Sequence, residues 1–389
     1  MENISIAVIG AGMSGLTAVL SLQKHGFKPI VYEAAPELGE VGAGLTISPN
    51  STHGLEYVGL GDELAKRADV PQAQAIIHYK TGEILVETKR GNIPKQKYGA
   101  NYYQIHRADL HEILGNAAKA GDPGCMVLGH TFKNYKETKS GIEVNFTNGK
   151  SITCDVVIGA DGIRSCVRES LFGPEDPKFT GNVAYRGLVD KGDLANDVIT
   201  PASGVAIAPR KAFTRYLVRN GEVLNFVAFV RRDGWDEEGW SIPATRKELL
   251  DEFGDWHPRI RALIEAAPEN KVFKWALYDR DPLDQWTKGH VTLLGDAAHP
   301  MLPFMGMGAA MGIEDGVILG RAFAAAETID EALQRYESAR KERANFVLLR
   351  SRAARERLQS DNPERYVEKK HKNEESLGLF DYNPGTTPI

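Results

Sequence analysis

The sequence predicts an α/β fold made of a parallel-sheet domain, an inserted mainly β domain and a long helix toward the C-terminus. In the first domain, short apolar strands end in glycine or an acid directly before helix-like segments, as strands of a parallel sheet do. Strand-like alternation then fills the middle of the chain, and a helix-like period of apolar residues follows the capping sequence that begins at Thr328. The expected division is a discontinuous first domain at 1–177 and 278–360, a substrate domain at 178–277 and a tail at 361–389.

Composition and charge favour a small molecule as the partner. The chain has 389 residues, of which 42% are hydrophobic and 25% charged, and its net charge is −5 with both signs interspersed. We therefore expect no nucleic acid and no membrane surface among its partners. The cysteines, Cys125, Cys154 and Cys166, are too widely spaced for a disulfide framework or for paired metal ligands. They are interpreted as buried thiols, and no metal site is expected.

Two features of the sequence indicate where in the cell the protein is found, namely its N-terminal residues and the lengths of its apolar runs. The chain opens directly into a strand, without the basic and apolar regions of a signal peptide. No apolar run approaches the roughly 18 residues that span a bilayer. The sequence thus predicts a soluble protein of the reducing cytoplasm.

A glycine-rich turn near the N-terminus is the strongest motif. An apolar strand at 4–9 is followed by Gly10, Gly12 and Gly15, then by an apolar helix and a second strand that ends at Glu33. The first glycine permits a tight turn, the second lets the backbone approach a pyrophosphate, and the third allows close packing of helix on strand. The helix N-terminus offers free N–H groups to the phosphates, and the acid can accept both ribose hydroxyls. This combination indicates a Rossmann-like domain that binds a dinucleotide.

The rest of the chain favours FAD over other dinucleotides. We find no catalytic His, Tyr/Lys pair or metal-ligand set of the kind that an NAD dehydrogenase presents. A disulfide reductase with two dinucleotides would need a second glycine fingerprint and a redox cysteine pair, and the sequence contains neither. FAD is therefore the expected cofactor.

Two further segments carry candidate cofactor ligands. Arg107 stands just before a predicted helix, where it could reach cofactor oxygens or could be a solvated helix-start residue. An apolar strand ending at Ile158 leads into Ala160-Asp161-Gly162 and then a helix, so Asp161 is a candidate anchor or part of a simple turn. An Asn-Gly pair at 148–149 predicts a hairpin just before that strand.

A third strand ends in an acid at Asp296. It is followed by a loop crowded with Gly, Pro and Met, and then by a helix from about Ala309. A strand end explains the position of the acid, and small loop residues let backbone N–H groups approach a ligand closely. The helix would direct its positive end at that ligand.

The three segments resemble, in order and spacing, those of the class A flavoprotein monooxygenases of the para-hydroxybenzoate hydroxylase fold. They are Gly10 to Gly15 with Glu33, Ala160-Asp161-Gly162, and Leu294-Gly-Asp-Ala-Ala-His-Pro300. The similarity is greatest to the branch that contains salicylate hydroxylase and 6-hydroxynicotinate 3-monooxygenase, and it covers roughly residues 3 to 355. It implies that Asp296 bonds the ribityl chain of FAD and that the loop from Pro303 passes beside the isoalloxazine.

The resemblance also implies the reaction. NADH or NADPH, visiting transiently, reduces FAD, and O2 then forms a flavin 4a-hydroperoxide that hydroxylates an aromatic or heteroaromatic ring, with or without loss of a carboxyl group. The protein has to orient the ring and exclude water. With the motifs above, the resemblance makes these residues the candidates for binding FAD: Gly10, Gly12, Ser14, Gly15, Glu33, Ala34, Thr46, Arg107, Phe132, Asp161, Asp296, Gly308 and Ala309.

The substrate residues are expected from the middle segment. Alternation places Tyr216 on one strand face with Thr214, and Arg215 on the other with Phe213. Tyr216 resembles a family residue that bonds or helps to deprotonate a ring hydroxyl, although a core tyrosine is an open alternative. The expected pocket comprises Arg186, Ala212, Tyr216, Pro303 and Met307.

This chain departs from its relatives at several polar positions. Many members of the branch carry His where this chain has Ala212 and Gln where it has Met307, and pyridine-hydroxylating relatives place a His within the segment matched by 44–46. Either the base lies elsewhere, with His299, Arg186 and Arg215 as candidates, or the substrate is bulkier or less acidic than salicylate. His299 has a structural role as an equal alternative. The predicted catalytic candidates are Tyr216, His299 and Arg215.

Two other function classes were weighed. An epoxidase or other monooxygenase acting on a non-aromatic alkene is the alternative that a less polar pocket favours. The same fold serves some prenyl-transfer escort proteins, but those are expected to lose Glu33 and Asp296, which are present here. The expected form is a monomer or a homodimer, with Gly378 to Tyr382 docking the tail on the body.

Overall fold

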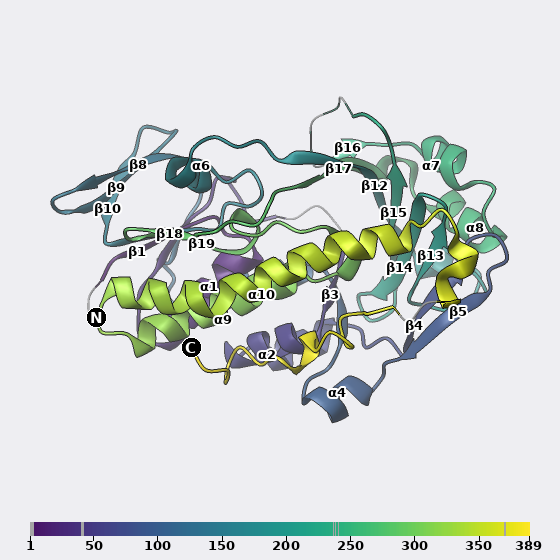
Figure 1. Ribbon diagram of the computed structural model, residues 1–389, viewed down its shortest axis with the longest axis horizontal. Helices are drawn as coiled ribbons and strands as arrows, with labels where there is room; N and C mark the ends of the chain where they lie inside the picture. Colours follow the sequence, from purple (N-terminus) through teal and green to yellow (C-terminus); the bar gives the residue numbers. More distant parts are fainter. Residues whose placement is uncertain (1–3, 40–42, 236, 238, 240, 369–370) are drawn as a thin grey trace.

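A computed structural model describes residues 4–39, 43–235, 237, 239, 241–368 and 371–389. It confirms the α/β class, with a parallel sheet at one end of the molecule and a larger, mostly antiparallel sheet at the other (Figure 1). The first sheet has the strand order β18-β19-β11-β1-β2-β7, parallel except at the β18 edge. Its strands are β1 (Ile6–Ile9), β2 (Ile30–Tyr32), β7 (Met126–Val127), β11 (Val156–Gly159), β18 (Thr287–Lys288) and β19 (Val291–Leu293).

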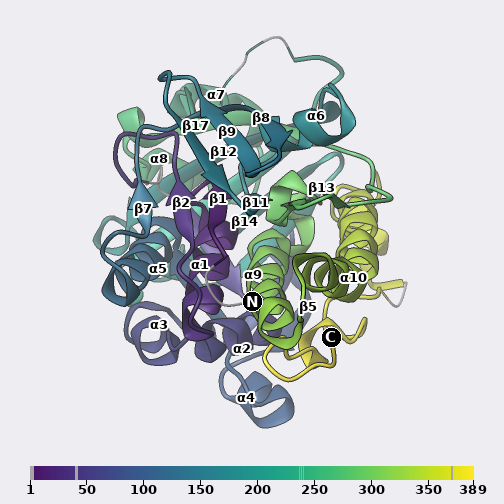
Figure 2. The same cartoon turned by 90° about the vertical axis from the view of Figure 1, so that its left-hand side faces the viewer.

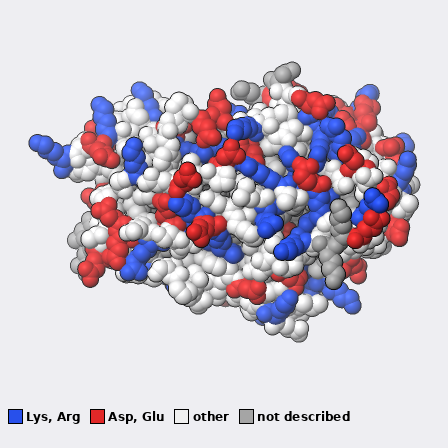
Figure 3. Space-filling model, in the orientation of Figure 1, with Lys and Arg blue, Asp and Glu red and all other residues white. Residues whose placement is uncertain are grey.

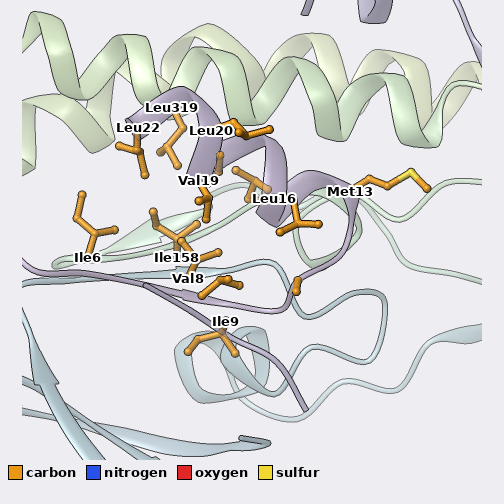
Figure 4. Packing of buried hydrophobic residues seen from close by; sticks show 14 of the residues in the cluster. Ile6, Val8, Ile9, Met13, Leu16, Val19, Leu20, Leu22, Ile158 and Leu319 are labelled. Atoms are coloured by element: carbon orange, nitrogen blue, oxygen red, sulfur yellow. The ribbon is translucent and has the colours of Figure 1, made fainter. Parts of the chain in front are cut away.

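Helices cover one face of this sheet, and a small sheet covers the other (Figure 2). The helices lie in the order α5 (Arg107–Gly121), α1 (Met13–Lys24), α9 (Gly308–Ala325) and α10 (Ile329–Leu358). On the opposite face lie α6 (Cys166–Phe172), β8 (Phe132–Thr138), β9 (Gly141–Phe146) and β10 (Ser151–Cys154). Because both faces are covered, the central strands β1 and β11 are apolar throughout, and they form a core with the inner face of α1 (Figure 4).

Helices α1 and α9 run parallel at close range. A Cβ atom on Gly312 would lie 2.0 Å from Ser14 Oγ, and one on Gly320 would lie 2.2 Å from Ser21 Oγ. Gly316 faces α1 between these two points in the same way. Because the contacts advance along both helices together, the two N-termini lie at the same end, beside the carboxyl ends of the parallel strands.

The second sheet has the order β16-β17-β12-β15-β14-β13-β4-β5. Its strands are β4 (Ala73–His78), β5 (Ile84–Lys89), β12 (Lys178–Asp190), β13 (Gly204–Ala208), β14 (Lys211–Val218), β15 (Val223–Arg231), β16 (Ile242–Pro243) and β17 (Phe273–Asp279). The sheet extends beyond the predicted range 178–277, because β4 from the N-terminal part pairs in parallel with β13. Helices α7 (Arg246–Phe253) and α8 (Pro258–Ala266) cover one of its faces.

The predicted C-terminal helix is confirmed, and it links the two ends of the molecule (Figure 1). Thr328 caps it by accepting a hydrogen bond from the Glu331 N–H. Near its other end, Glu356 bonds Arg231 of β15 at 2.8 Å. The docking of the tail is also confirmed, since Leu379 and Phe380 are buried.

The remaining elements connect these layers. They are β3 (Gly44–Ile47), which pairs with β6 (Tyr103–His106), and the helices α2 (Pro49–Tyr57), α3 (Gly61–Arg67) and α4 (Ile93–Tyr98). The predicted Asn-Gly hairpin lies between β9 and β10, with Gly149 at a φ of 83°. Cys125 and Cys154 are buried as expected, but Cys166 is exposed because it begins a surface helix.

Acidic and basic side chains are mixed over the visible surface (Figure 3). Within the part of the chain that the structure describes, no helix has both the length and the apolar character needed to cross a bilayer. The same described residues contain no cluster of His, Cys, Asp and Glu suited to a metal ion.

Candidate active site

Four strand ends meet at one edge of the parallel sheet. Gly10 follows β1, Glu33 follows β2, Asp161 lies just beyond β11, and Asp296 follows β19. Since the strands are parallel neighbours, their carboxyl ends bring these residues together, and this edge is where ligands of open α/β sheets bind.

The three glycines of the turn have different surroundings. Gly10 has a φ of 106°, and a Cβ there would lie 2.5 Å from the Ala160 carbonyl oxygen. A Cβ on Gly15 would lie 2.1 Å from the Gly10 carbonyl oxygen. By contrast, a Cβ on Gly12 would meet no atom within 4 Å. The fold itself therefore requires Gly10 and Gly15, whereas Gly12 opens onto space that a pyrophosphate would fill.

Glu33 lies against this turn. One carboxylate oxygen accepts a hydrogen bond from the Ala11 N–H at 2.7 Å, and the other accepts one from the Ala35 N–H at 2.9 Å. Each oxygen has a second lone pair for a ribose hydroxyl. Ala34, another predicted contact, is exposed beside it.

Asp296 lies in a recess at the far end of the same edge. Its side chain is open to solvent, yet the surrounding protein atoms raise its pKa by desolvation, while His299 and Arg107 act in the opposite direction. Helix α9 begins at Gly308 and Ala309, so its positive end lies at this edge. Thr46 of β3 lies opposite Gly306, where an added Cβ would be 3.6 Å from the threonine Cβ.

Two predicted cofactor ligands have other partners. Asp161 accepts hydrogen bonds from Ser165 Oγ at 2.5 Å and from the Val167 N–H at 3.1 Å, so both of its oxygens serve the start of α6. Phe132 is buried in the core beside Phe146. Ser14 also has a packing role, because it fills the gap between α1 and the glycines of α9.

Tyr216 lies on the face of the second sheet that turns toward the cofactor edge. It is directly opposite Asn225 of β15, and that side chain accepts a hydrogen bond from the Gly44 N–H at 2.7 Å. The Asn225 Nδ2 group is buried, and it has no hydrogen-bond partner among the residues that the structure describes. Burial, and next the nearby Tyr102, raise the pKa of Tyr216 above its ordinary value. The tyrosine is therefore a neutral hydroxyl at physiological pH.

Gly44 and Asn225 are site residues that the sequence did not predict individually. The available signal was that Asn225 is the polar residue within the apolar run 223–230 of β15. Its position opposite Tyr216 depends on the register in which β14 and β15 pair, and that register cannot be read from the sequence.

Part of the predicted pocket is packed. Ala212 and Met307 belong to one apolar cluster between the sheet and the loop after β19, and Met307 accepts a weak bond from Ser48 Oγ at 3.7 Å. In this loop Pro303 is exposed, while Phe304 packs on Phe229 with ring centres 4.8 Å apart.

The structure gives His299 a structural role rather than the predicted catalytic one. Its Nε2 lies 2.5 Å from an oxygen of Asp315, and both side chains are fully buried. Arg340 of α10 bonds the other oxygen of Asp315 at 2.7 Å and also pairs with Glu314. The histidine thus belongs to a buried charge cluster that joins the strand end to α9 and α10.

Arg215 and Arg186 also lie away from the Tyr216 hydroxyl. The alternation of β14 puts Arg215 on the opposite sheet face, beside α8, as the predicted faces required. Arg186 shares the face of Tyr216 but extends toward the other edge, where it bonds Ser241 Oγ at 2.8 Å and lies over Trp275. Neither arginine side chain lies beside the Tyr216 hydroxyl.

Comparisons with known proteins agree with this geometry. A family model described as "FAD binding domain" matches residues 3–351. The chain is 35% identical over 346 residues to 6-hydroxynicotinate 3-monooxygenase of Pseudomonas fluorescens, covering 88% of this chain and 89% of that protein. It is 37% identical over 349 residues to 3-amino-4-hydroxybenzoate 2-monooxygenase of Streptomyces platensis, covering 89% and 86%.

A solved structure extends the match to the whole fold. Klebsiella pneumoniae HpxO complexed with FAD and uric acid has a TM-score of 0.87 and 25% identity, covering 99% of this chain and 97% of that one. The chain therefore belongs to the FAD-binding-domain family, within the class A flavin monooxygenases. It is an FAD-dependent oxidoreductase that uses NAD(P)H and O2.

The residues present fit FAD. Along one edge lie, in this order, the partly free carboxylate of Glu33, the open space at Gly12 and the solvent-facing Asp296, which matches the order of ribose, pyrophosphate and ribityl chain in FAD. Arg107 adds a cation near Asp296.

Proposed function

We propose that this protein hydroxylates an aromatic or heteroaromatic ring of the phenolic, hydroxybenzoate or hydroxypyridine type. The observation that carries the proposal is the pairing of Tyr216 with Asn225 beside the FAD edge, in a chain similar to hydroxylases of such rings. FAD, when bound, supplies the reduction by NAD(P)H and the activation of O2. The protein has to hold the ring and keep water out.

The second sheet offers a floor for a flat ring. Four residues pair across neighbouring strands on the Tyr216 face and are only half-buried, in contrast to most of the sheet; they are Ile76, Val205, Thr214 and Val227. Three of them are apolar, so the floor suits the face of a ring. Thr214 supplies the polar group of this row.

Tyr216 and Asn225 supply hydrogen bonds at one end of this floor. Burial keeps the tyrosine hydroxyl neutral. The hydroxyl therefore acts as a hydrogen-bond donor or acceptor to a ring substituent and not as a base that is already deprotonated. The Nδ2 group of Asn225, which bonds none of the described residues, is a second donor beside it. A phenolic or keto oxygen is the substituent that matches two such donors.

Water exclusion follows from the packing of the loop after β19. Phe304, Met305 and Met307 join the apolar cluster that includes Ala212. A dry site prevents the reducing power of NAD(P)H from being lost as H2O2. The absence of polar groups at 212 and 307 also favours a substrate less acidic than salicylate.

The test is oxidation of NADH and NADPH by the FAD-loaded protein, with H2O2 quantified alongside, across hydroxybenzoates, hydroxypyridines, larger phenols and an isoprenoid alkene. A ring compound that stimulates oxidation with little peroxide supports the proposal. Coupled turnover with the alkene alone would replace the proposed reaction by epoxidation. We further expect a cytoplasmic protein that acts as a monomer or homodimer, which size-exclusion chromatography and fractionation would test.

A further inference from the structure

A buried cation lies on the far side of the second sheet from Tyr216. Arg215 is 3% exposed, and its Nε and Nη1 atoms are buried without a hydrogen-bond partner among the described residues. It forms none of the ion pairs found in the part of the chain that the structure describes. A buried guanidinium normally has its donors satisfied, because an unpaired buried charge costs several kcal/mol.

The guanidinium lines a small cavity between the sheet and α8 that is partly open to solvent. Tyr79, Pro201, His257 and Arg259 also line it. For the centre of a water-sized sphere, the volume of this cavity is about 10 Å³. A volume of that size holds one particle about as large as a water molecule.

A second cation, Arg259, also lines this cavity. His257 and His78 contribute imidazole rings, and burial lowers the pKa of His257, so that ring is neutral at physiological pH. Among the described residues, no acid lines the cavity. Helix α8 begins beside the cavity, but the N–H groups of its first turn are bonded to His257, so the helix contributes its dipole and no free donor. The nearest acids act from outside the wall, Asp197 on His257 and Glu364 on His78 at 3.7 Å, and both are exposed.

Burial is the main cause that lowers the pKa of Arg215, to about 10, and the charge of Arg259 adds to it. Even that lowered value leaves the side chain protonated at physiological pH. Desolvation is therefore not relieved by loss of the proton, and the charge calls for a counter-ion.

We propose that this cavity binds one chloride-sized anion, held by the Arg215 guanidinium, with Arg259 as the second cation of the wall. The site is separate from the proposed substrate site, because β14 places Arg215 and Tyr216 on opposite faces of the sheet. The bound anion stabilises β14 and the docking of α8 on it.

Crystals of the FAD-loaded wild-type protein, grown without halide and then soaked in bromide, test the site directly. The expected result is an anomalous peak for bromide within hydrogen-bond distance of the Arg215 guanidinium. A soak that labels surface sites but leaves this cavity occupied by water, or shows Arg215 bonded to protein oxygens, overturns the proposal.

Thermal unfolding provides the test in solution. At constant ionic strength, replacing gluconate by chloride should raise the Tm of the wild type by about 2 °C in a saturable manner. Arg215→Met should abolish this dependence, whereas Arg261→Met, at an exposed position on α8, should retain it. An equal chloride response in Arg215→Met would contradict the proposal. If that variant does not fold, the bromide experiment on the wild type still decides.

Discussion

The ring of Tyr216 packs directly on the backbone of Gly44. A Cβ atom at residue 44 would lie 2.3 Å from Tyr216 Cε2 and 2.7 Å from its hydroxyl oxygen. The adjacent Gly44 N–H donates to Asn225, so β3 holds both polar residues of the proposed substrate site. A strand of the cofactor domain thereby positions side chains of the second sheet.

Gly44→Ala should displace Tyr216 and lower kcat/KM by about 10²-fold, because a shift of about 1 Å in a positioning contact has an effect of that size. FAD occupancy should change little. Steady-state kinetics with the substrate found in the coupled assay provide the measurement. Gly192→Ala is the matched control, since a Cβ at residue 192 meets no atom within 4 Å. Unchanged kinetics in Gly44→Ala would show that Tyr216 is not held by this contact.

The two glycines at the start of α1 should differ in what their replacement disturbs. Gly12→Ala should leave the apoprotein stable but weaken FAD binding, because the new methyl group enters the space left for the pyrophosphate. Gly15→Ala should lower the Tm of the apoprotein, because its methyl group would overlap the Gly10 carbonyl. Flavin absorbance and differential scanning fluorimetry separate the two effects. Wild-type FAD affinity in Gly12→Ala would refute the placement of the pyrophosphate.

Removing the hydroxyl of Tyr216 should slow catalysis without introducing a new pH dependence. Tyr216→Phe should lower kcat by about 10- to 10²-fold if the hydroxyl bonds the ring substituent in the transition state. Because the pKa of Tyr216 lies above its ordinary value of 10.0, the wild type and the variant should have the same pH profile from about pH 6 to 9. A wild-type limb in that range that disappears in the variant would show that the tyrosine ionises during turnover.

The buried cluster at Asp315 should make stability depend on pH in acid. Burial alone would raise the pKa of Asp315, but His299 and Arg340 outweigh it and lower the pKa from 3.8 to about 2. The unfolded chain therefore takes up the proton first as pH falls. The stabilising contribution, about 2 kcal/mol, is present above about pH 5 and is lost as pH falls toward 2.

Asp315→Asn should accordingly lower the urea midpoint at neutral pH, and the gap to wild type should narrow as the solution is acidified. The total loss at neutral pH should be about 3 to 5 kcal/mol, since the change removes a partner from buried charges. Asp251→Asn, in an exposed pair with Lys247, is the control and should cost less than about 1 kcal/mol. A gap that stays constant with pH would mean that Asp315 does not titrate as described.

Local patterns account for what could be predicted of the cofactor site. Gly10 and Glu33 directly follow apolar strands, Asp296 comes three residues after one, and parallel strands bring such ends to one edge whatever the loops between them do. Alternation along β14 also assigned the two sheet faces correctly. The same alternation places Arg215 and Tyr216 on opposite faces of the sheet. It therefore conflicts with the prediction that both residues are catalytic.

Contacts between distant segments account for the rest. His299 bonds Asp315, 16 residues further on, and Arg340 reaches the same carboxylate from another helix, which no short pattern reveals. Asp161 is different, because its partner Ser165 is only four residues away. An Asp followed by Ser before a helix is a capping pattern, and it was available in the sequence.

The glycine-lined contact between α1 and α9 has a consequence for cofactor binding. Because Gly312, Gly316 and Gly320 leave no slack against α1, the two helix starts keep a constant separation. One start lies at Gly12, where the pyrophosphate is placed, and the other at Gly308, beside the expected position of the isoalloxazine, so the helix pair would fix the distance between these two parts of FAD. A side chain larger than glycine in the contact would change that distance and should therefore alter flavin binding without touching the flavin.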